Sequence, residues 1–256
     1  MNIKMVLTAL CIVLAGCVTP QVPTSHSEIL DEYRAMSQRL DRLAAPLLEG
    51  SLGLCSNKSP DVGIGYHSLD TYPDDLQPVA KTYWGLGTDK TVLYVRAGGA
   101  AEKVGLGFGD IPSVEALKAL AKNESICGFG TQVRIQPNKN AFANGRDIIV
   151  TNSLMRSVDD LALSLIIGHE LAHNILGEKP GISIAEREAE ADRWAIFLMA
   201  RAGLDYNKAV RKFAAVTPPH GSRVLLHDVQ KARFRAFRKV ASEVKALQRS
   251  GEPLEP

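Results

Sequence analysis

The chain has 256 residues, of which 45% are hydrophobic and 23% are charged. These shares are close to the average of globular proteins and argue against collagen-like, disordered and multi-span membrane proteins. Its 30 Lys and Arg residues nearly balance 28 Asp and Glu residues, so the chain lacks the excess of positive charge typical of nucleic-acid binding.

The N-terminus indicates an export signal. Lys4 precedes the apolar run Met5–Ala15, which is too short to span a bilayer and has the length of a signal-peptide core. The run leads into Leu14-Ala15-Gly16-Cys17, which resembles the lipobox of bacterial lipoproteins. The resemblance implies that residues 1–16 are removed and that Cys17 carries a lipid, and Val18 implies the periplasmic face of the outer membrane. The alternative is an ordinary cleaved signal with a chance cysteine.

The other cysteines are interpreted from this compartment. Residues 17–27 contain several Pro, Ser and Thr residues and predict a tether between the lipid and the folded body. Cys55 and Cys127 are then the cysteines that remain in the folded body, and an oxidising compartment favours a disulfide between them. Two buried free thiols are the alternative.

Hydrophobic spacing predicts the first folded elements. Residues 28–50 predict an amphipathic helix, because apolar residues recur there every three or four positions. They are Leu30, Tyr33, Met36, Leu40, Leu43 and Leu47. Residues 51–90 are rich in Gly, Pro, Asp and Ser, and they predict strands and turns.

The next segment resembles part of a PDZ domain of the bacterial protease type. An apolar strand at 92–95 is followed by a glycine turn, a short helix with small residues at its start, and Gly109-Asp110. The resemblance implies a PDZ-like module over residues 51–130, and PDZ domains bind extended peptides at a sheet edge. Because Ile111-Pro112 and a predicted helix at 113–122 replace the usual next strand, the module is truncated. Both a scaffold role and a peptide-binding role stay open.

The candidate chemistry lies at His169-Glu170-Leu171-Ala172-His173, within an apolar segment that predicts a buried helix. Residues four apart share one face of a helix, so His169 and His173 can bind one metal ion. A catalytic zinc also needs a third protein ligand and an open position for water. Glu170 would then be the general base and the proton donor to the leaving amine. The alternative is a core helix with two hydrogen-bonded histidines.

The third ligand is sought in the acidic stretch 186–192. Glu188 and Asp192 share a helical face, so Glu188 is predicted to bind the metal and Asp192 to accept a hydrogen bond from a ligating histidine. Glu186 with Glu190 is the competing pair, and it is more typical of a solvated helix face.

These residues resemble a family. His169 to His173, followed by Glu188-Ala189-Glu190-Ala191-Asp192, is similar to the zinc metallopeptidases of the HtpX, Oma and CAAX prenyl protease type, peptidase family forty-eight. The resemblance implies a zincin-like, mainly helical core with a small sheet over residues 131–248, one Zn²⁺ per chain, and peptide-bond hydrolysis. It also implies a substrate-pairing strand that contains Asn140, Ala141 and Phe142. Asn140 is alternatively a turn residue.

The family's site commonly ends in a His-Pro pair with an arginine six residues after the histidine. The best match here is His227-Asp228 with Arg233, and His220 with Arg223 competes. His227 is interpreted as a group that stabilises the oxyanion or occupies the open zinc position at rest. The alternative is a surface histidine on a basic helix at about 224–248, whose cations either face solvent or lie on anionic lipid.

We therefore expect an α+β protein, ending in a tail at 249–256, that is a zinc-dependent endopeptidase of the bacterial cell envelope. The expected partners are protein or peptide substrates, among them misfolded envelope proteins, a membrane reached through the lipid, and envelope assembly machinery. One alternative is a zinc-stabilised binding or chaperone lipoprotein without turnover. Another is a protease inhibited by its own His227 or by the loop at 177–185.

Overall fold

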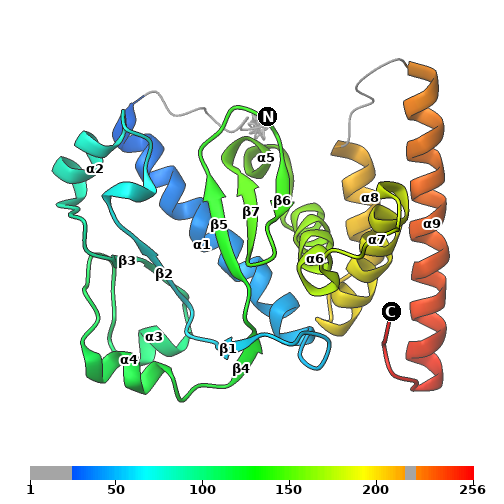
Figure 1. Cartoon of the computed structure of the whole chain (residues 1–256), viewed down its shortest axis with the longest axis horizontal. Coiled ribbons are helices and arrows are strands. Elements are labelled where there is room, and N and C mark those ends of the chain that lie inside the picture. The colour runs from blue at the N-terminus through cyan, green and yellow to red at the C-terminus, as the bar shows by residue number, and fades with distance from the viewer. Residues whose placement is uncertain (1–24, 217–222) are drawn as a thin grey trace, which may run out of the picture.

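The computed structural model describes residues 25–216 and 223–256 (Figure 1). Within these ranges it describes every side chain except those of residues 216 and 223–231. The elements are α1 (His26–Gly50), β1 (Lys58–Pro60), β2 (Ile64–His67), a 3-10 turn (Leu69–Thr71), α2 (Gln77–Trp84), β3 (Thr91–Val95), α3 (Ala100–Lys103), α4 (Val114–Leu120), β4 (Ser125–Cys127), β5 (Gly130–Arg134), β6 (Ala141–Ala143), β7 (Asp147–Thr151), α5 (Asn152–Ser157), α6 (Asp160–Leu176), α7 (Ile184–Arg201), α8 (Tyr206–Val216) and α9 (Arg223–Ser250). This mixture of helices and small sheets agrees with the expected α+β class.

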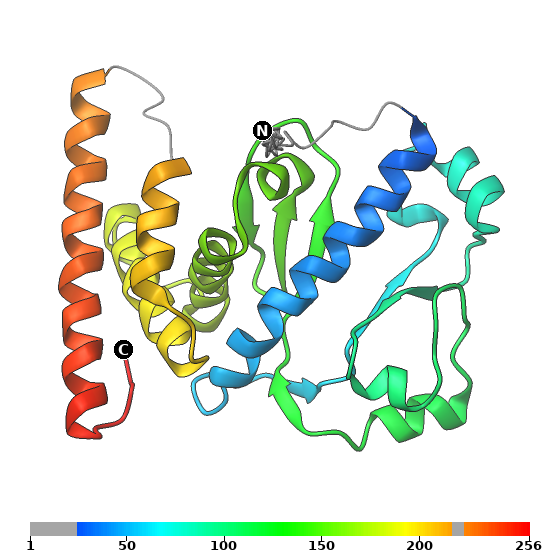
Figure 2. The same cartoon turned by 180° about the vertical axis from the view of Figure 1, so that it is seen from behind.

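Helix α1 connects the two halves of the fold. Ser25 caps it, because its hydroxyl accepts a hydrogen bond from the backbone of Glu28 while the Glu28 carboxylate accepts one from the backbone of Ser25. The apolar stripe predicted for residues 28–50 is buried, and the helix begins two residues earlier than predicted. Figure 2 shows α1 running diagonally across the strands, and it contacts β3 and α2 on one side and β5, α6 and α7 on the other.

Residues 51–130 form two antiparallel strand pairs, β1 with β4 and β2 with β3. The prediction of strands and turns over 51–90 is wrong for α2. Pro78 occupies the first turn of this helix, where its missing N–H costs nothing, and Gly85 ends it with a φ of 65°. The predicted helix at 113–122 is confirmed as α4, which Ser113 caps. Whether this region is PDZ-like stays a prediction.

The predicted disulfide is confirmed. Cys55 lies just before β1, and Cys127 is the last residue of β4. In the pairing of these two strands, Cys127 lies opposite Lys58. The disulfide therefore fixes the point at which the chain leaves α1 and enters the strands.

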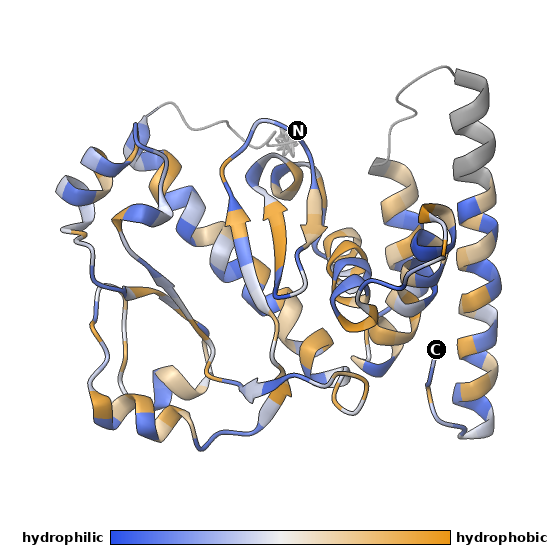
Figure 3. Cartoon of the chain, in the orientation of Figure 1, coloured by the Kyte–Doolittle hydropathy of each residue, from blue (hydrophilic) through white to orange (hydrophobic). Residues whose placement is uncertain are grey.

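A three-stranded sheet forms the centre of the second half, in the order β5-β7-β6. Strand β5 is parallel to β7, and β6 is antiparallel to it. Figure 3 shows β7 as almost entirely hydrophobic, and its residues Ile148, Ile149 and Val150 are buried. Helix α1 covers one face of the sheet, and α6 packs beside β6. In Figure 1, α6, then α7 with α8, and finally α9 follow the sheet toward one side of the molecule.

The C-terminal residues close the fold against α1. Arg201, the last residue of α7, donates hydrogen bonds to the carbonyl oxygens of Gly50, Leu52 and Leu254. Within the described ranges, each helix is too short or too polar to cross a membrane.

Candidate active site

Helix α6 carries the two histidines, and its ends are defined by local sequence. The Asp159 carboxylate accepts a hydrogen bond from the backbone of Ala162 at 2.9 Å, which begins the helix. Gly177, with a φ of 63°, follows its last turn. Asn174 joins α6 to the turn between β6 and β7, since its side chain accepts from the backbone of Gly145 at 2.7 Å and donates to the Asp147 carbonyl at 3.2 Å. No sequence pattern predicts this contact, because it joins α6 to a turn far from it in the chain.

Three candidate ligands converge between α6 and α7. The Nε2 atoms of His169 and His173 lie 3.1 Å apart. Carboxylate oxygens of Glu188 lie 3.2 Å from His169 Nε2 and 3.4 Å from His173 Nε2. Tetrahedral ligands bound at about 2.0–2.1 Å lie about 3.3 Å from one another. The donor set and its spacing therefore fit a divalent metal ion such as Zn²⁺.

The two other glutamates of this stretch have different partners. The Glu186 carboxylate accepts a hydrogen bond from the backbone of Ser183 at 2.8 Å, which completes the cap of α7. Glu190 accepts one from the Lys179 ammonium at 2.7 Å. The structure thus separates Glu186 and Glu190 from the histidines and brings Glu188 to them.

Asp192 and Arg233 hold His169 from behind. His169 Nδ1 lies 2.8 Å from Asp192 Oδ1, and a carboxylate only accepts, so Nδ1 carries the proton and Nε2 faces the candidate ligands. The Arg233 guanidinium, from α9, donates to both oxygens of Asp192 at 2.6 Å. The bidentate contact with Arg233 holds the Asp192 carboxylate in place, and this carboxylate in turn orients the His169 imidazole.

Burial and neighbouring charges both shift the pKa values of the groups in the site, often in opposite directions. Burial lowers the pKa of His169, but the carboxylates of Asp192 and Glu188 outweigh it and raise the pKa to about 9. The pKa of His173 is lowered, first by burial and then by the neighbouring His169. Burial raises the pKa of Glu170, which the positive charge of His169 and a hydrogen bond from the Ala143 backbone oppose.

A cavity of about 450 Å³ extends from this cluster to the start of β6. Glu170 lines it, and so do Asn140 and Ala141. The Asn140 backbone donates to Thr151 Oγ1 at 3.0 Å, which places it at the start of β6. Phe142 lies outside the lining and packs under the Arg134 guanidinium, 4.9 Å from the ring centroid. Of the three predicted substrate-strand residues, the structure therefore brings two to the cavity.

The rest of the cavity wall is mostly apolar, which no sequence pattern predicts. Besides Lys139 and Ser157, its apolar residues are Leu154, Val158, Leu165, Ile166, Ala195, Phe213 and Phe237. The apolar residues come from five helices or helix ends, so only the packing of α5 to α9 brings them together.

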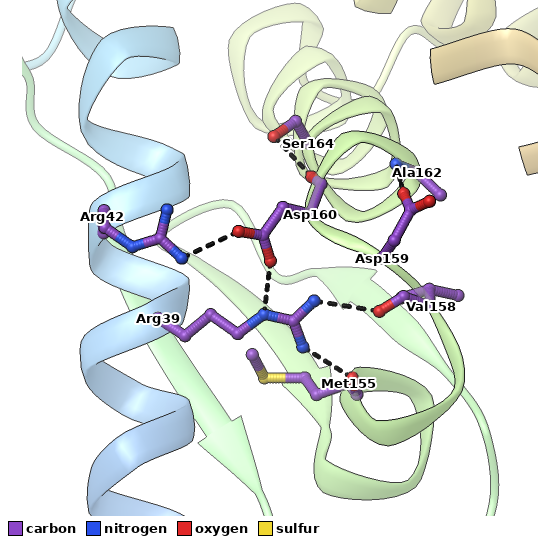
Figure 4. Close-up of polar contacts among 8 residues, drawn as sticks. All are labelled: Arg39, Arg42, Met155, Val158, Asp159, Asp160, Ala162 and Ser164. Carbon is purple, nitrogen blue, oxygen red and sulfur yellow. Dashed lines mark hydrogen bonds and ion pairs between the residues drawn. The ribbon is translucent and has the colours of Figure 1, made fainter. Parts of the chain in front are cut away.

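The corner between α5 and α6, which supplies Val158, is held by α1 (Figure 4). Arg39 donates to the carbonyl oxygens of Met155 at 2.7 Å and Val158 at 2.9 Å, and to the Asp160 carboxylate at 2.7 Å. Arg42 reaches the other oxygen of Asp160 at 2.9 Å. One wall of the cavity thus depends on the first helix of the fold.

Some predicted residues lie outside the described part of the chain. These are Cys17 and His220, and the side chain of His227. The backbone of His227 belongs to α9, the helix that also carries Arg233. The role predicted for His227 stays a prediction.

Comparison with known proteins supports one family. The model of peptidase family M48 matches residues 117–179, from within α4 to just after α6. The match includes His169, Glu170 and His173, and it ends before Glu188. It covers less than half of the chain and supports a metal-dependent peptidase of the M48 type. No curated protein and no solved structure matches the chain.

Proposed function

We propose that the chain is a zinc-dependent endopeptidase. The observation that carries this proposal is the convergence of His169, His173 and Glu188, whose candidate ligand atoms all lie within 4.8 Å of one another. The buried Glu170 lies beside them on α6, and one cavity reaches both the cluster and a sheet edge. The helix pair α6–α7 beside a small sheet supports a zincin-like core for residues 131–248.

In this proposal Glu170 moves the proton. Zinc, when bound, polarises the scissile carbonyl and lowers the pKa of water. The Glu170 carboxylate accepts a proton from the attacking water and donates it to the leaving amine. The backbone N–H of Ala143 orients this carboxylate from β6. Asp192 keeps the proton of His169 on Nδ1, and Arg233 holds Asp192 in place.

The substrate lies as an extended chain along β6. Among the described residues, β6 pairs only with β7, so its other edge has main-chain groups for a substrate strand. Because the cavity wall beyond the cluster is mostly apolar, a large apolar side chain near the scissile bond is favoured. Peptide bonds in misfolded or misassembled envelope proteins meet both requirements, since extended apolar segments are exposed there.

The proposed localisation of the enzyme is argued from the sequence of its N-terminus. We propose that Cys17 carries the lipid and that the enzyme acts at the periplasmic face of the outer membrane. Processing that globomycin blocks, together with recovery of the protein in the outer-membrane fraction, is the expected result. A soluble, unacylated product would contradict the anchor and leave the catalytic proposal unaffected.

The catalytic proposal is tested with Glu170→Gln, which keeps the size of the side chain and removes the base. Purified wild type loaded with zinc is expected to hydrolyse unfolded casein, whereas the variant keeps its zinc by elemental analysis and loses hydrolysis. Glu178→Gln, at an exposed position just after α6, is the matched control and keeps both. Wild type that holds zinc and cleaves no unfolded protein would overturn the proposal. Unchanged cleavage by Glu170→Gln would remove Glu170 from the mechanism.

A further inference from the structure

A second cavity lies at the other edge of the sheet that carries the candidate active site. Strand β6 forms one edge of this sheet, and β5 forms the other. A cavity of about 580 Å³ lies between β5 and β2, with residues of α1 on its floor. Figures 1 and 2 show β2 and β5 diverging on one side of α1. Among the described residues that line this cavity, none is a candidate metal ligand. We name it the edge groove and define it by residues 59–68 and 129–133.

Two unbroken runs of residues line the edge groove. Every residue from 59 to 68 and from 129 to 133 contributes to its lining. Side chains of a strand alternate between two faces, so an unbroken run of lining residues indicates that the strand presents its edge. Within the described chain, β2 pairs only with β3, and β5 pairs only with β7. Each strand therefore leaves a row of backbone N–H and C=O groups without a strand partner, which is a template for pairing.

Strand β5 is the better template of the two. Its pairing with β7 is continuous over all five residues. The pairing of β2 with β3 shifts register between Gly65 and Tyr66. The ring of Tyr94 also lies against the backbone of Gly65, because a Cβ added there would come within 2.1 Å of it. A regular strand edge and an irregular one thus face the same groove.

The part of the groove beside β1 and β4 is covalently fixed. The β1–β4 pair lies there, and the Cys55–Cys127 disulfide joins its two sides. The Asn57 side chain adds a hydrogen bond of 2.7 Å to the carbonyl of Gly128. A groove with a fixed end loses little conformational entropy when it binds an extended chain.

The charges of the groove are balanced. Its lining contains three carboxylates and two cations: Asp41, Asp61, Asp147, Lys90 and Arg146. A third cation, Arg96, pairs with Asp41 at 3.1 Å and also with Asp61. A balanced lining fits an uncharged polypeptide main chain, whereas a polyanion such as nucleic acid or a lipid headgroup cluster needs an excess of cations.

We propose that the edge groove binds an extended segment of another polypeptide, through main-chain hydrogen bonds to β5. The segment adds a fourth strand to the sheet on the edge opposite β6. The groove is then a binding site separate from the candidate active site, and it does not depend on the metal.

The test uses two peptides on protein that cannot turn over. A short fluorescein-labelled peptide of alternating threonine and valine is titrated into Glu170→Gln in the presence of a metal chelator. The control peptide is the same sequence with N-methyl groups on every residue, which removes the hydrogen-bond donors of both strand edges. Fluorescence anisotropy is expected to show binding of the first peptide at least about tenfold tighter than the second, a difference of about 1.4 kcal/mol. Equal binding would overturn the proposal.

A variant and a cross-link place the binding. Gln132 is exposed on β5 and lines the groove, so Gln132→Trp narrows it and is expected to weaken the first peptide at least about tenfold. Asn207→Trp, at an exposed position on α8, is the matched control and leaves binding unchanged. A photoreactive version of the peptide is expected to cross-link to residues 59–68 or 129–133. Cross-links confined to 139–143 would assign the peptide to β6 and overturn the proposal. Peptide binding in the groove, together with zinc-loaded wild type that hydrolyses no unfolded protein, would contradict the catalytic proposal alone.

Discussion

Arg233 on α9 and Asp192 on α7 are joined by two hydrogen bonds of 2.6 Å, and the same carboxylate lies 2.8 Å from His169 Nδ1. Arg233→Met keeps most of the side chain's length and removes the charge. Because partners of ligating histidines orient the ligand, we expect zinc affinity to fall about 10–100-fold. Competition with a fluorescent chelator measures it. Arg235→Met, at an exposed position on the same helix, is the control, and equal affinity of both variants would exclude this orienting role.

Arg39 and Arg42, both on α1, allow a partly buried ion pair to be compared with an exposed one. Arg39 binds two carbonyl oxygens and Asp160, and its side chain is 24% exposed, whereas Arg42 binds Asp160 alone and is 57% exposed. Arg39→Met leaves two carbonyl groups without their donor and is expected to lower the free energy of unfolding by about 2–3 kcal/mol. Arg42→Met is expected to lower it by less than about 1 kcal/mol. Urea unfolding compares the two, and equal losses would contradict this ranking.

The disulfide closes a loop with a sequence separation of 72 residues. Replacing Cys55 and Cys127 together by alanine frees this loop in the unfolded chain and is expected to lower the free energy of unfolding by about 4 kcal/mol. Zinc affinity of the folded variant should remain that of the wild type, since neither cysteine lines the cavity of the candidate site. Urea unfolding under oxidising conditions measures the first effect and chelator competition the second. A loss below about 1 kcal/mol would show that the loop entropy is not what the disulfide contributes.

His67 predicts a pH dependence of stability. It is 2% exposed, and its Nδ1 lies 2.7 Å from the Tyr72 hydroxyl. Burial, and secondly the charge of Arg34, lower its pKa from 6.5 to about 4. Between pH 6.5 and about 4, the unfolded chain binds more protons than the folded one. The contribution of the neutral His67 to the free energy of unfolding is therefore complete above pH 6.5 and is lost as the pH falls toward 4. The loss amounts to about 3 kcal/mol.

The measurement for His67 is a difference between proteins. Urea unfolding at several pH values between 4 and 7 is compared for wild type and His67→Gln, which cannot titrate. The variant is expected to be less stable at pH 7 and to lose less stability than the wild type as the pH falls. His26→Gln removes an exposed histidine and serves as the control. Parallel curves for wild type and His67→Gln would rule out the buried imidazole as the cause.

The part of the site that could be predicted from the sequence is the part that one helix defines. His169 and His173 lie on one face because they are four residues apart, and no tertiary information is needed to see it. The choice of Glu188 over Glu190 could only be argued from the neighbouring Asp192. In the structure Lys179 also separates the two glutamates, because it reaches Glu190 from the preceding loop.

What the sequence could not show depends on how distant elements pack. The bidentate contact of Arg233 with Asp192 requires α9 to lie on α7. The apolar cavity wall similarly requires α5 to α9 to meet. Strand β5 pairs with β7 and not with β6, the next strand in the sequence. This parallel pairing cannot be predicted from a hairpin turn, because a hairpin joins consecutive antiparallel strands. Helix α2 could not be recognised by composition, because the Gly and Pro residues at its ends are also typical of loops. Pro78 and Gly85 are nevertheless ordinary signals for the start and the end of a helix.

The position of α1 also constrains how the chain acquires its structure. This helix precedes every other described element, yet its apolar stripe is buried against β5, α6 and α7, which begin at Gly130, Asp160 and Ile184. An N-terminal fragment that ends before these elements leaves the stripe exposed to water. Contacts over such long sequence separations form slowly. Completion of the fold, with the candidate ligands brought together between α6 and α7, therefore waits for the second half of the chain to be available.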